Sequence, residues 1–191
     1  MPLETIFATS SPQRKSICRR HGIRCSFRSS NASEAAKGRS ARHVAISNAM
    51  KKARKCLRRR QDAIVIGADT VVSFRGKIIG KPKSKGEARR IISALAGKSH
   101  RVITGVCMLH AGMEKCYSDC SSVKFRGLSR QGVEKFVASG SWKGKAGGYG
   151  VQSDSRELIA SVGGSRENVE GLDGKRLKKE LKAFIARIGR A

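Results

Sequence analysis

The stretch that most constrains this chain is an apolar run over residues 63–72, which a single carboxylate, Asp69, interrupts. Its apolar and β-branched side chains predict a strand that is covered on both faces. Aspartate is depleted in strands, and burying its charge without a partner is costly. We therefore expect Asp69 to meet backbone donors, a cation, a metal or a ligand. A buried carboxylate held only by hydrogen bonds or a salt bridge explains the run equally well.

Strand and helix patterns alternate over the first half of the chain, and two long strands then follow each other. Strands are expected over residues 3–9, 23–27, 63–74, 77–79, 101–109, 114–125 and 158–162. Helices are expected over 12–21, 41–59, 84–97, 129–139 and from about 173 onward. This order predicts an α/β fold with a mixed, twisted β-sheet flanked by helices. Without an internal repeat or linker, residues 1–191 are expected to form a single domain.

The chain carries 41 Lys and Arg against 14 Asp and Glu, which gives a formal net charge of +27. Residues 11–60 hold 16 of these basic residues and one acid, Glu34. Such a field attracts polyanions, including nucleic acids, nucleotides and acidic membranes. The charges lie singly on many predicted elements and form no tail, so solvated helix and strand faces account for them as well.

Six cysteines occur without a Cys-x-x-Cys pair, and the chain has four histidines. This pattern argues against a structural zinc site and favours reduced thiols in a cytoplasmic protein. The N-terminus shows no basic region followed by an apolar one, so no signal peptide is expected. No apolar run approaches the roughly 20 residues of a membrane span.

The first predicted strand leads into a helix start at Ser11 and Pro12, a favourable N-cap and first helical residue. Ser10, Ser11 and Arg14 would cluster where the helix amides are unpaired, which suits a phosphate group. An ordinary helix cap is the alternative. Residues 76–81 resemble a Walker A motif but have one residue too few between the glycines, so a P-loop NTPase is excluded.

Carboxylates are scarce, which gives weight to the two that fall among basic residues. Glu34 and Asp69 are candidates to hold a divalent cation against a polyphosphate, since hard cations take oxygen ligands. Lys52 and Lys81 are candidates to neutralise phosphate charge. A metal-assisted hydrolysis would also need a base that activates water. Taken singly, Lys52 is also explained as a solvated helix lysine, and Lys81 as a turn lysine before a proline.

Several motifs follow one another in an order that covers essentially the whole chain. The first, residues 8–14, is similar to Ala-Ser-x-Ser-Pro-Arg-Arg. The others are Glu34 and residues 49–53, 67–72, 80–82, 100–106, 123–126, 145–152 and 168–172. Together these motifs resemble the Maf family of nucleoside triphosphate pyrophosphatases. Gln13 differs from the family pattern, because an arginine is usual there, and Ser141 stands where glutamate is frequent.

The resemblance implies a Maf/ITPase-like fold with a nucleotide cleft between two lobes. It implies hydrolysis of a nucleoside triphosphate to the monophosphate and pyrophosphate with a divalent cation, Mg or Mn. The general base would be Asp69. The motif at residues 67–70 and the one ending at Gln152 are similar to the dTTP- and UTP-cleaving branch, with substrate choice at Gln13, Thr70 and Gln152.

The remaining site residues complete this hypothesis. Ser11, Arg14, Lys52 and Lys81 would bind phosphates, while Glu34 and Asp69 would hold the cation. The family also suggests a homodimer. The alternative function is a basic nucleic-acid-binding protein with an inactive Maf-like fold. The high net charge favours that alternative, and the nine aromatic residues give it little stacking surface.

Overall fold

In the computed structural model, the described residues are 3–35, 38–58, 62–151 and 153–190. Within these ranges seven strands form one sheet in the order β2-β1-β3-β5-β6-β7, and β4 pairs with β3. Strands β1–β2 and β1–β3 are parallel, while the other pairs are antiparallel. The predicted mixed sheet is therefore confirmed. The strands are β1 (Thr5–Ala8), β2 (Ser26–Arg28), β3 (Ile64–Phe74), β4 (Lys77–Ile79), β5 (Ser99–His110), β6 (Met113–Phe125) and β7 (Ile159–Gly163).

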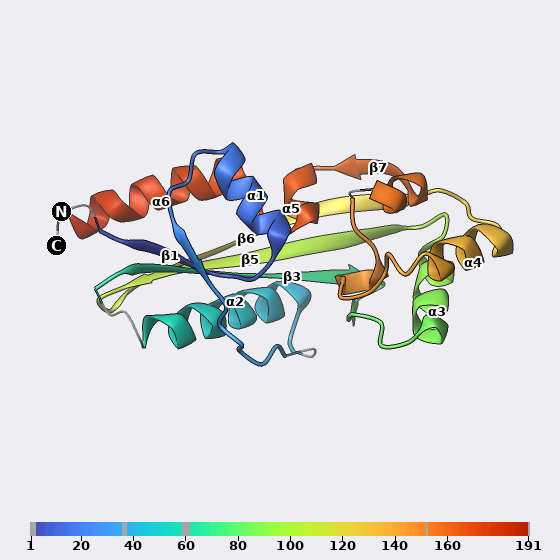
Figure 1. Ribbon diagram of the computed structural model, residues 1–191, viewed down its shortest axis with the longest axis horizontal. Helices are drawn as coiled ribbons and strands as arrows, with labels where there is room; N and C mark the ends of the chain where they lie inside the picture. The colour runs from blue at the N-terminus through green and yellow to red at the C-terminus, as the bar shows by residue number, and fades with distance from the viewer. Residues whose placement is uncertain (1–2, 36–37, 59–61, 152, 191) are drawn as a thin grey trace.

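Helices divide the elongated molecule into two lobes that share β3, β5 and β6 (Figure 1). In one lobe α2 covers one face of the sheet, and α1, α5 and α6 lie over the opposite face. In the other lobe α3 and α4 pack together beyond the end of α2. The helices are α1 (Pro12–Arg20), α2 (Ala41–Leu57), α3 (Lys85–Leu95), α4 (Arg130–Ala138), α5 (Arg166–Glu170) and α6 (Gly174–Ile188), with 3-10 helices η1 (Ala146–Gly148) and η2 (Ser153–Leu158).

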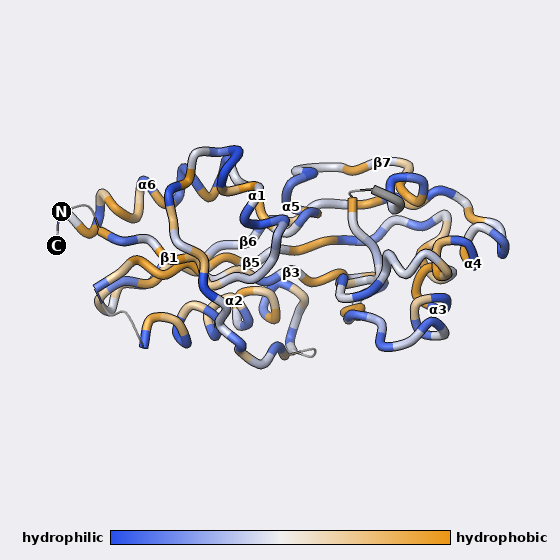
Figure 2. Tube along the Cα trace, in the orientation of Figure 1, coloured by the Kyte–Doolittle hydropathy of each residue, from blue (hydrophilic) through white to orange (hydrophobic). Residues whose placement is uncertain are grey.

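Apolar side chains concentrate along the strands, as the orange stretches of β3 and β5 show in Figure 2. In the first lobe, α1 and α6 bury Ile17, Leu177 and Phe184 against the sheet. In the second lobe, Ile92 of α3 and Phe136 of α4 share a core with the far ends of the strands. Because the long strands enter both cores, the position of one lobe is tied to that of the other. The assignment of residues 1–191 to one domain stays a prediction.

The predicted strand over residues 23–27 is misplaced, since β2 covers Ser26–Arg28. Ile23 instead closes the end of α1, where its backbone N–H donates to the Cys18 carbonyl at 2.9 Å and its side chain enters the core. An apolar residue that packs at a helix end cannot be distinguished from a strand residue by composition alone. Helix α5 was also absent from the prediction, because five residues are too short to show a helical period.

Helix α2 lies unusually close to the sheet, because two glycines leave room for its backbone. A Cβ on Gly67 of β3 would lie 2.1 Å from the Ala49 carbonyl oxygen. On Gly105 of β5, a Cβ would lie 2.5 Å from the Ala45 carbonyl carbon. Real Cβ atoms are not found at such distances from backbone, so both positions require glycine. The close approach brings the polar residues on this face of α2 to the level of the strand backbone.

The cysteine prediction is wrong for one pair. Cys107 of β5 and Cys116 of β6 are directly opposite in the antiparallel ladder, with Cα atoms 4.2 Å apart, and they form a disulfide. The two cysteines are nine residues apart in sequence, and the register of the β5–β6 hairpin brings them opposite each other. The other cysteines, Cys18, Cys25, Cys56 and Cys120, are not joined by disulfides.

We expect Gly105→Ala to lower the free energy of unfolding by about 3 kcal/mol or more, because the added methyl group would displace α2 from the sheet. Urea denaturation followed by circular dichroism measures the loss. Gly127→Ala is the matched control, since a Cβ there has nothing within 4 Å and we expect a change of less than about 0.5 kcal/mol. Equal stability of the two variants would contradict the packing described for α2.

Candidate functional site

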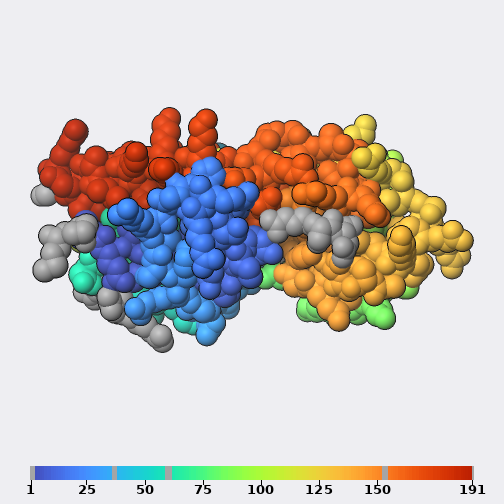
Figure 3. Space-filling model, turned by 45° about the horizontal axis from the view of Figure 1, so that its top comes forward, coloured from blue at the N-terminus to red at the C-terminus, as the bar shows by residue number. Residues whose placement is uncertain are grey.

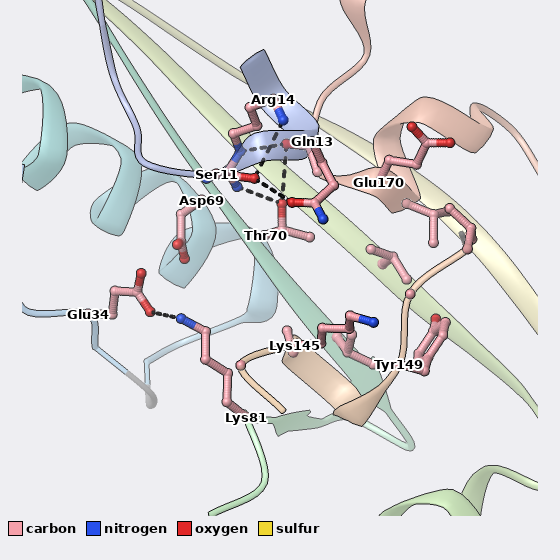
Figure 4. A pocket seen from close by; sticks show the side chains of 18 of the residues that line it. Ser11, Gln13, Arg14, Glu34, Asp69, Thr70, Lys81, Lys145, Tyr149 and Glu170 are labelled. Atoms are coloured by element: carbon pink, nitrogen blue, oxygen red, sulfur yellow. Dashed lines mark hydrogen bonds and ion pairs between the residues drawn. The ribbon is translucent and has the colours of Figure 1, made fainter. Parts of the chain in front are cut away.

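A cavity of about 290 Å³ opens between the two lobes, above the middle of β3 (Figure 4). A second cavity, of about 390 Å³, continues it toward the start of α1. Both cavities are lined by Ser11, Gln13, Arg14, Glu34, Lys52, Lys81 and Gly144. In the space-filling view, the blue N-terminal segment and the orange segment of the second lobe meet at the middle of the molecule (Figure 3). The cleft predicted between two lobes is therefore present.

Asp69 lies on β3 at the base of the cavity and is only 5% exposed. Its Oδ1 accepts a hydrogen bond from Lys52 Nζ at 2.6 Å, and its Oδ2 accepts one from Asn48 Nδ2 at 2.9 Å. Both partners come from α2, one helical turn apart. Asp69 therefore meets a cation, one of the partners expected for it, and a side-chain amide; these contacts equally fit the alternative of a carboxylate held by hydrogen bonds and a salt bridge. An ionised carboxylate has about four acceptor sites, so Asp69 keeps acceptor capacity beyond these two bonds.

Glu34 extends this ion pair into a chain of alternating charges. Its Oε1 lies 2.8 Å from Lys52 Nζ, and its Oε2 accepts from Lys81 Nζ at 3.0 Å. Partial burial opposes ionisation of Glu34, but the two lysines outweigh it and lower the pKa of this carboxyl to about 2. Glu34 is therefore fully ionised at neutral pH. The chain Asp69–Lys52–Glu34–Lys81 joins β3, α2, a loop and the segment after β4.

The start of α1 forms the adjacent wall. Ser11 Oγ caps the helix by accepting from the Arg14 backbone N–H at 3.4 Å, and it donates to Gln13 Oε1 at 3.0 Å. Desolvation lowers the pKa of Arg14, but a guanidinium remains protonated at neutral pH. Arg14 Nε donates to the Gly171 carbonyl oxygen at 2.9 Å, so this arginine also bridges to the segment after α5.

The hydroxyl group of Thr70 lies between the Arg14 guanidinium and the Thr104 hydroxyl group. Arg14 Nη2 donates to Thr70 Oγ1 at 3.0 Å, and the Oγ1 atoms of Thr70 and Thr104 lie 2.9 Å apart. Thr104 uses its single hydroxyl proton on the Asn168 carbonyl oxygen at 3.1 Å. Thr70 then donates to Thr104 or to the Gly171 carbonyl oxygen at 3.4 Å, and its oxygen, which accepts once from Arg14, has a second lone pair.

The second half of the cavity is largely apolar. Its wall is formed by Val72, Val102, Ala146, Tyr149, Val151 and Val169, with the stem of Lys145 beside them. Tyr149 is fixed by its hydroxyl group, which lies 2.5 Å from His100 Nε2. The rings of His100 and Phe125 contact the Tyr149 ring edge to face, at centroid distances of 5.2 and 4.8 Å.

The structure brings together all the predicted site residues that it describes: Ser11, Gln13, Arg14, Glu34, Lys52, Asp69, Thr70 and Lys81. Gln152 lies outside the described residues. The sequence reasoning missed Asn48, Lys145 and Tyr149 as site residues. Asn48 sits four residues before Lys52 on one face of α2, which was a signal for a shared partner. Lys145 and Tyr149 belong to the glycine-rich motif, whose direction toward the cavity was not visible in sequence.

The donor set fits a hard divalent cation that is shared with a substrate. Two carboxylates, from Glu34 and Asp69, approach the same Lys52 ammonium group, so they already converge on a positive charge. Within the described part of the chain, no group of three or more His, Cys, Asp or Glu residues is placed to hold a metal. Mg²⁺ is commonly bound by one or two carboxylates together with waters and substrate phosphates, so a two-carboxylate set is sufficient.

A family model for Maf-like proteins matches residues 4–184. The chain belongs to the Maf family. The recognition from motifs is thereby confirmed, and with it the predicted α/β fold class. In the described residues of this family member, no helix is long and apolar enough to cross a membrane.

Curated relatives of this Maf protein match most of its length. A dTTP/UTP pyrophosphatase of Pyrococcus horikoshii is 36% identical over 167 residues, which covers 87% of this chain and 89% of the relative. One of the same name from Dictyoglomus thermophilum is 36% identical and covers 95% of this chain and 96% of its own. Among solved structures, the Staphylococcus aureus Ham1 protein matches 64% of this chain and 71% of its own, with 12% identity and a TM-score of 0.46.

His100, 3% exposed, gives the fold a pH dependence, because burial lowers its pKa from 6.5 to about 4. The unfolded chain then binds the proton more tightly than the folded protein. The stability associated with neutral His100 is complete above about pH 6.5 and falls by up to about 3 kcal/mol as the pH drops toward 4. Urea titrations of wild type and His100→Phe at several pH values measure this term.

We expect the stability of His100→Phe to decline less than that of wild type between pH 6.5 and 4. His43→Phe, at an exposed position on α2, is the control and should keep the wild-type slope. Parallel slopes for all three proteins would show that the buried imidazole does not titrate in this range.

Proposed function

We propose that this protein is a nucleoside triphosphate pyrophosphatase that hydrolyses dTTP or UTP to the monophosphate and pyrophosphate. The observation that carries the proposal is the ion-pair chain from buried Asp69 and Lys52 to the more exposed Glu34 and Lys81, which lies beside a helix N-terminus in the cleft of a Maf protein. The names of the curated relatives supply the substrate class. Related modified pyrimidine nucleotides belong to the same class.

In the proposed reaction, water attacks the α-phosphorus and pyrophosphate leaves. Asp69 accepts the proton of that water, because it is a fixed carboxylate in the cleft with free acceptor positions. Lys52 and Asn48 orient Asp69 through its two oxygens. The buried position limits the solvent around Asp69, which strengthens its electrostatic interactions with the reacting groups.

Phosphate binding is assigned to the polar half of the cleft. Ser11 and Arg14 sit where α1 begins, so backbone amides, the helix dipole and a guanidinium act together on an anion. Lys52 and Lys81 add two ammonium groups opposite them. Glu34 and Asp69 would hold a divalent cation, Mg or Mn, which supplies charge neutralisation on the phosphates when it is bound.

Substrate choice is assigned to Gln13, Thr70 and Gln152. Gln13 lines both cavities. Its side-chain carbonyl oxygen accepts a hydrogen bond from the Ser11 hydroxyl group, so its amide nitrogen remains as a donor to a ligand. Thr70 presents the second lone pair described above. Discrimination by such groups is strong, because a wrong substrate leaves buried polar atoms unpaired.

We further propose, from the family resemblance, that the protein acts as a homodimer in the cytoplasm.

Asp69→Asn should lower kcat for dTTP by about 10²- to 10⁴-fold, because the amide keeps the shape but cannot take the proton. Release of pyrophosphate from dTTP, UTP, dCTP, GTP and ATP, each with and without added Mg²⁺ or Mn²⁺, measures the activity and the substrate class. Asp62→Asn, at an exposed carboxylate just before β3, is the control and should retain the wild-type rate. Wild-type turnover by Asp69→Asn would refute the assignment of the base.

A second candidate function is binding of nucleic acid through the basic surface, which the net charge of +27 favours. Electrostatic binding falls steeply with salt, so we expect RNA and DNA affinity to drop by orders of magnitude between about 50 and 200 mM salt. Filter binding over this range measures it. Tight binding that survives about 200 mM salt, together with no triphosphate turnover, would favour this second function over the first.

A further inference from the structure

The apolar half of the cleft contains a cation that the proposed mechanism does not use. Lys145 precedes η1 and is half-buried in the cavity wall. Figure 4 shows its ammonium group directed into the cavity, beside Tyr149, with no dashed line to another residue drawn. Across the described part of the chain, its side chain has no hydrogen-bond acceptor or ion-pair partner. The ammonium group is open to the cavity, where an acceptor atom of a ligand can replace the water around it.

The position of Lys145 separates it from the phosphate-binding groups. The second cavity, which extends from the start of α1, is lined by Lys52 and Lys81 but not by Lys145. Both of those lysines are ion-paired with Glu34. The first cavity, which all three lysines line, also carries Glu170 and a group of apolar and aromatic side chains: Val72, Val102, Tyr149, Val151 and Val169. Within it Lys145 lies beside Tyr149 (Figure 4). Apolar and aromatic walls suit a planar base, whereas a triphosphate needs polar surroundings.

The loop that carries Lys145 is held in place. The Gly147 backbone N–H donates to the Gly80 carbonyl oxygen at 3.0 Å. Gly147 has φ of 69°, and a Cβ there would lie 3.0 Å from Val72, so the loop packs tightly against β3. The Lys145 stem passes along Gly150, where a Cβ would lie 3.5 Å from Lys145 Cδ. A fixed loop presents the ammonium group without a large ordering cost on binding.

We propose that Lys145 is a specificity-determining residue that donates a hydrogen bond from Nζ to O4 of a uracil or thymine base. This inference rests on the proposed function and names how the same site reads its substrate. Lysine has three donors and no acceptor. Uracil and thymine carry a carbonyl oxygen at C4, whereas cytosine carries an amino group there. Lys145 therefore stabilises bound uracil or thymine. With cytosine, its ammonium group would face the C4 amino group, which is also a donor.

A second group on the same edge of the base, the ring N3–H, has a possible partner in the cleft, Thr70. The ring N3–H of uracil and thymine is a donor, and Thr70 Oγ1, which accepts one hydrogen bond from Arg14, has a second lone pair that can accept from N3–H. One donor from Lys145 and one acceptor from Thr70 match the O4 and N3–H pair that distinguishes these bases from cytosine. The apolar walls raise the cost of a mismatch, since no water replaces the missing partner.

The test compares Lys145→Met with wild type on dTTP, UTP and dCTP, by kcat/KM for pyrophosphate release. Methionine keeps the length of the apolar stem and removes the donor. We expect kcat/KM for dTTP and UTP to fall by about 10- to 100-fold, the range of one charge-assisted hydrogen bond, with dCTP changed by less than about threefold. Lys143→Met, at an exposed position of the same loop, should match wild type on all three.

A substrate lacking the acceptor gives a second, independent measurement. The triphosphate of a pyrimidin-2-one nucleoside carries hydrogen in place of O4. Its ring N3 also carries no hydrogen, so the analogue loses the partner of Thr70 in both proteins, and only the loss at O4 depends on Lys145. The ratio of kcat/KM for UTP to that for the analogue should therefore be about 10- to 100-fold larger in wild type than in Lys145→Met. Comparing two proteins on two substrates isolates the contact between Lys145 and O4. A general loss of stability in the variant would lower kcat/KM for both substrates equally and would leave their ratio unchanged.

The outcomes separate the two proposals. An equal fall in kcat/KM for dTTP, UTP and dCTP would indicate that Lys145 acts on the phosphates and would overturn this assignment. An unchanged preference of Lys145→Met for dTTP and UTP over dCTP would also overturn it. In both cases wild-type turnover of dTTP would leave the proposed function intact. A wild-type protein that releases no pyrophosphate from any triphosphate would instead refute the proposed function, and with it this reading of the base.

Discussion

The organisation of the site depends on one buried ion pair, between Asp69 of β3 and Lys52 of α2. A carboxylate at 5% exposure requires a partner charge, and Lys52 Nζ at 2.6 Å provides it. The pair exists only because α2 approaches the sheet closely at Gly67 and Gly105. The two glycines and the ion pair therefore belong to one arrangement: packing of backbone on backbone brings the charged groups within bonding distance.

Much of the fold could be predicted because its patterns are local. The apolar run of β3, the Ser-Pro start of α1 and the Ala-Gly turn between β5 and β6 each carry their signal within a few residues. The errors arose where a contact depends on tertiary packing or on strand register. Ile23 packs at a helix end instead of in a strand, and Cys107 bonds to Cys116 because the hairpin register places them opposite each other.

The polar half of the site was predictable for a similar reason, since charged residues are conspicuous in apolar or sparsely acidic segments. Asp69 interrupts an apolar strand, and Glu34 is the one acid within residues 11–60. Asn48, Lys145 and Tyr149 gave no such contrast. Their roles depend on which way a helix face and a glycine-rich loop turn, and that direction is set by tertiary contacts such as Gly147 with Gly80.

The charge of the polar half is largely offset before any ligand arrives, with Arg14 leaving one net positive charge, which explains why it can hold so many ionised groups. Glu34 and Asp69 offset Lys52 and Lys81, so each lysine is kept near the cleft by a carboxylate. In the proposed reaction, phosphate oxygens compete with Glu34 for these lysines. Each lysine that turns to a phosphate releases carboxylate oxygens, and those oxygens become available to the divalent cation. The same four residues can thus stabilise both the empty cleft and the occupied one.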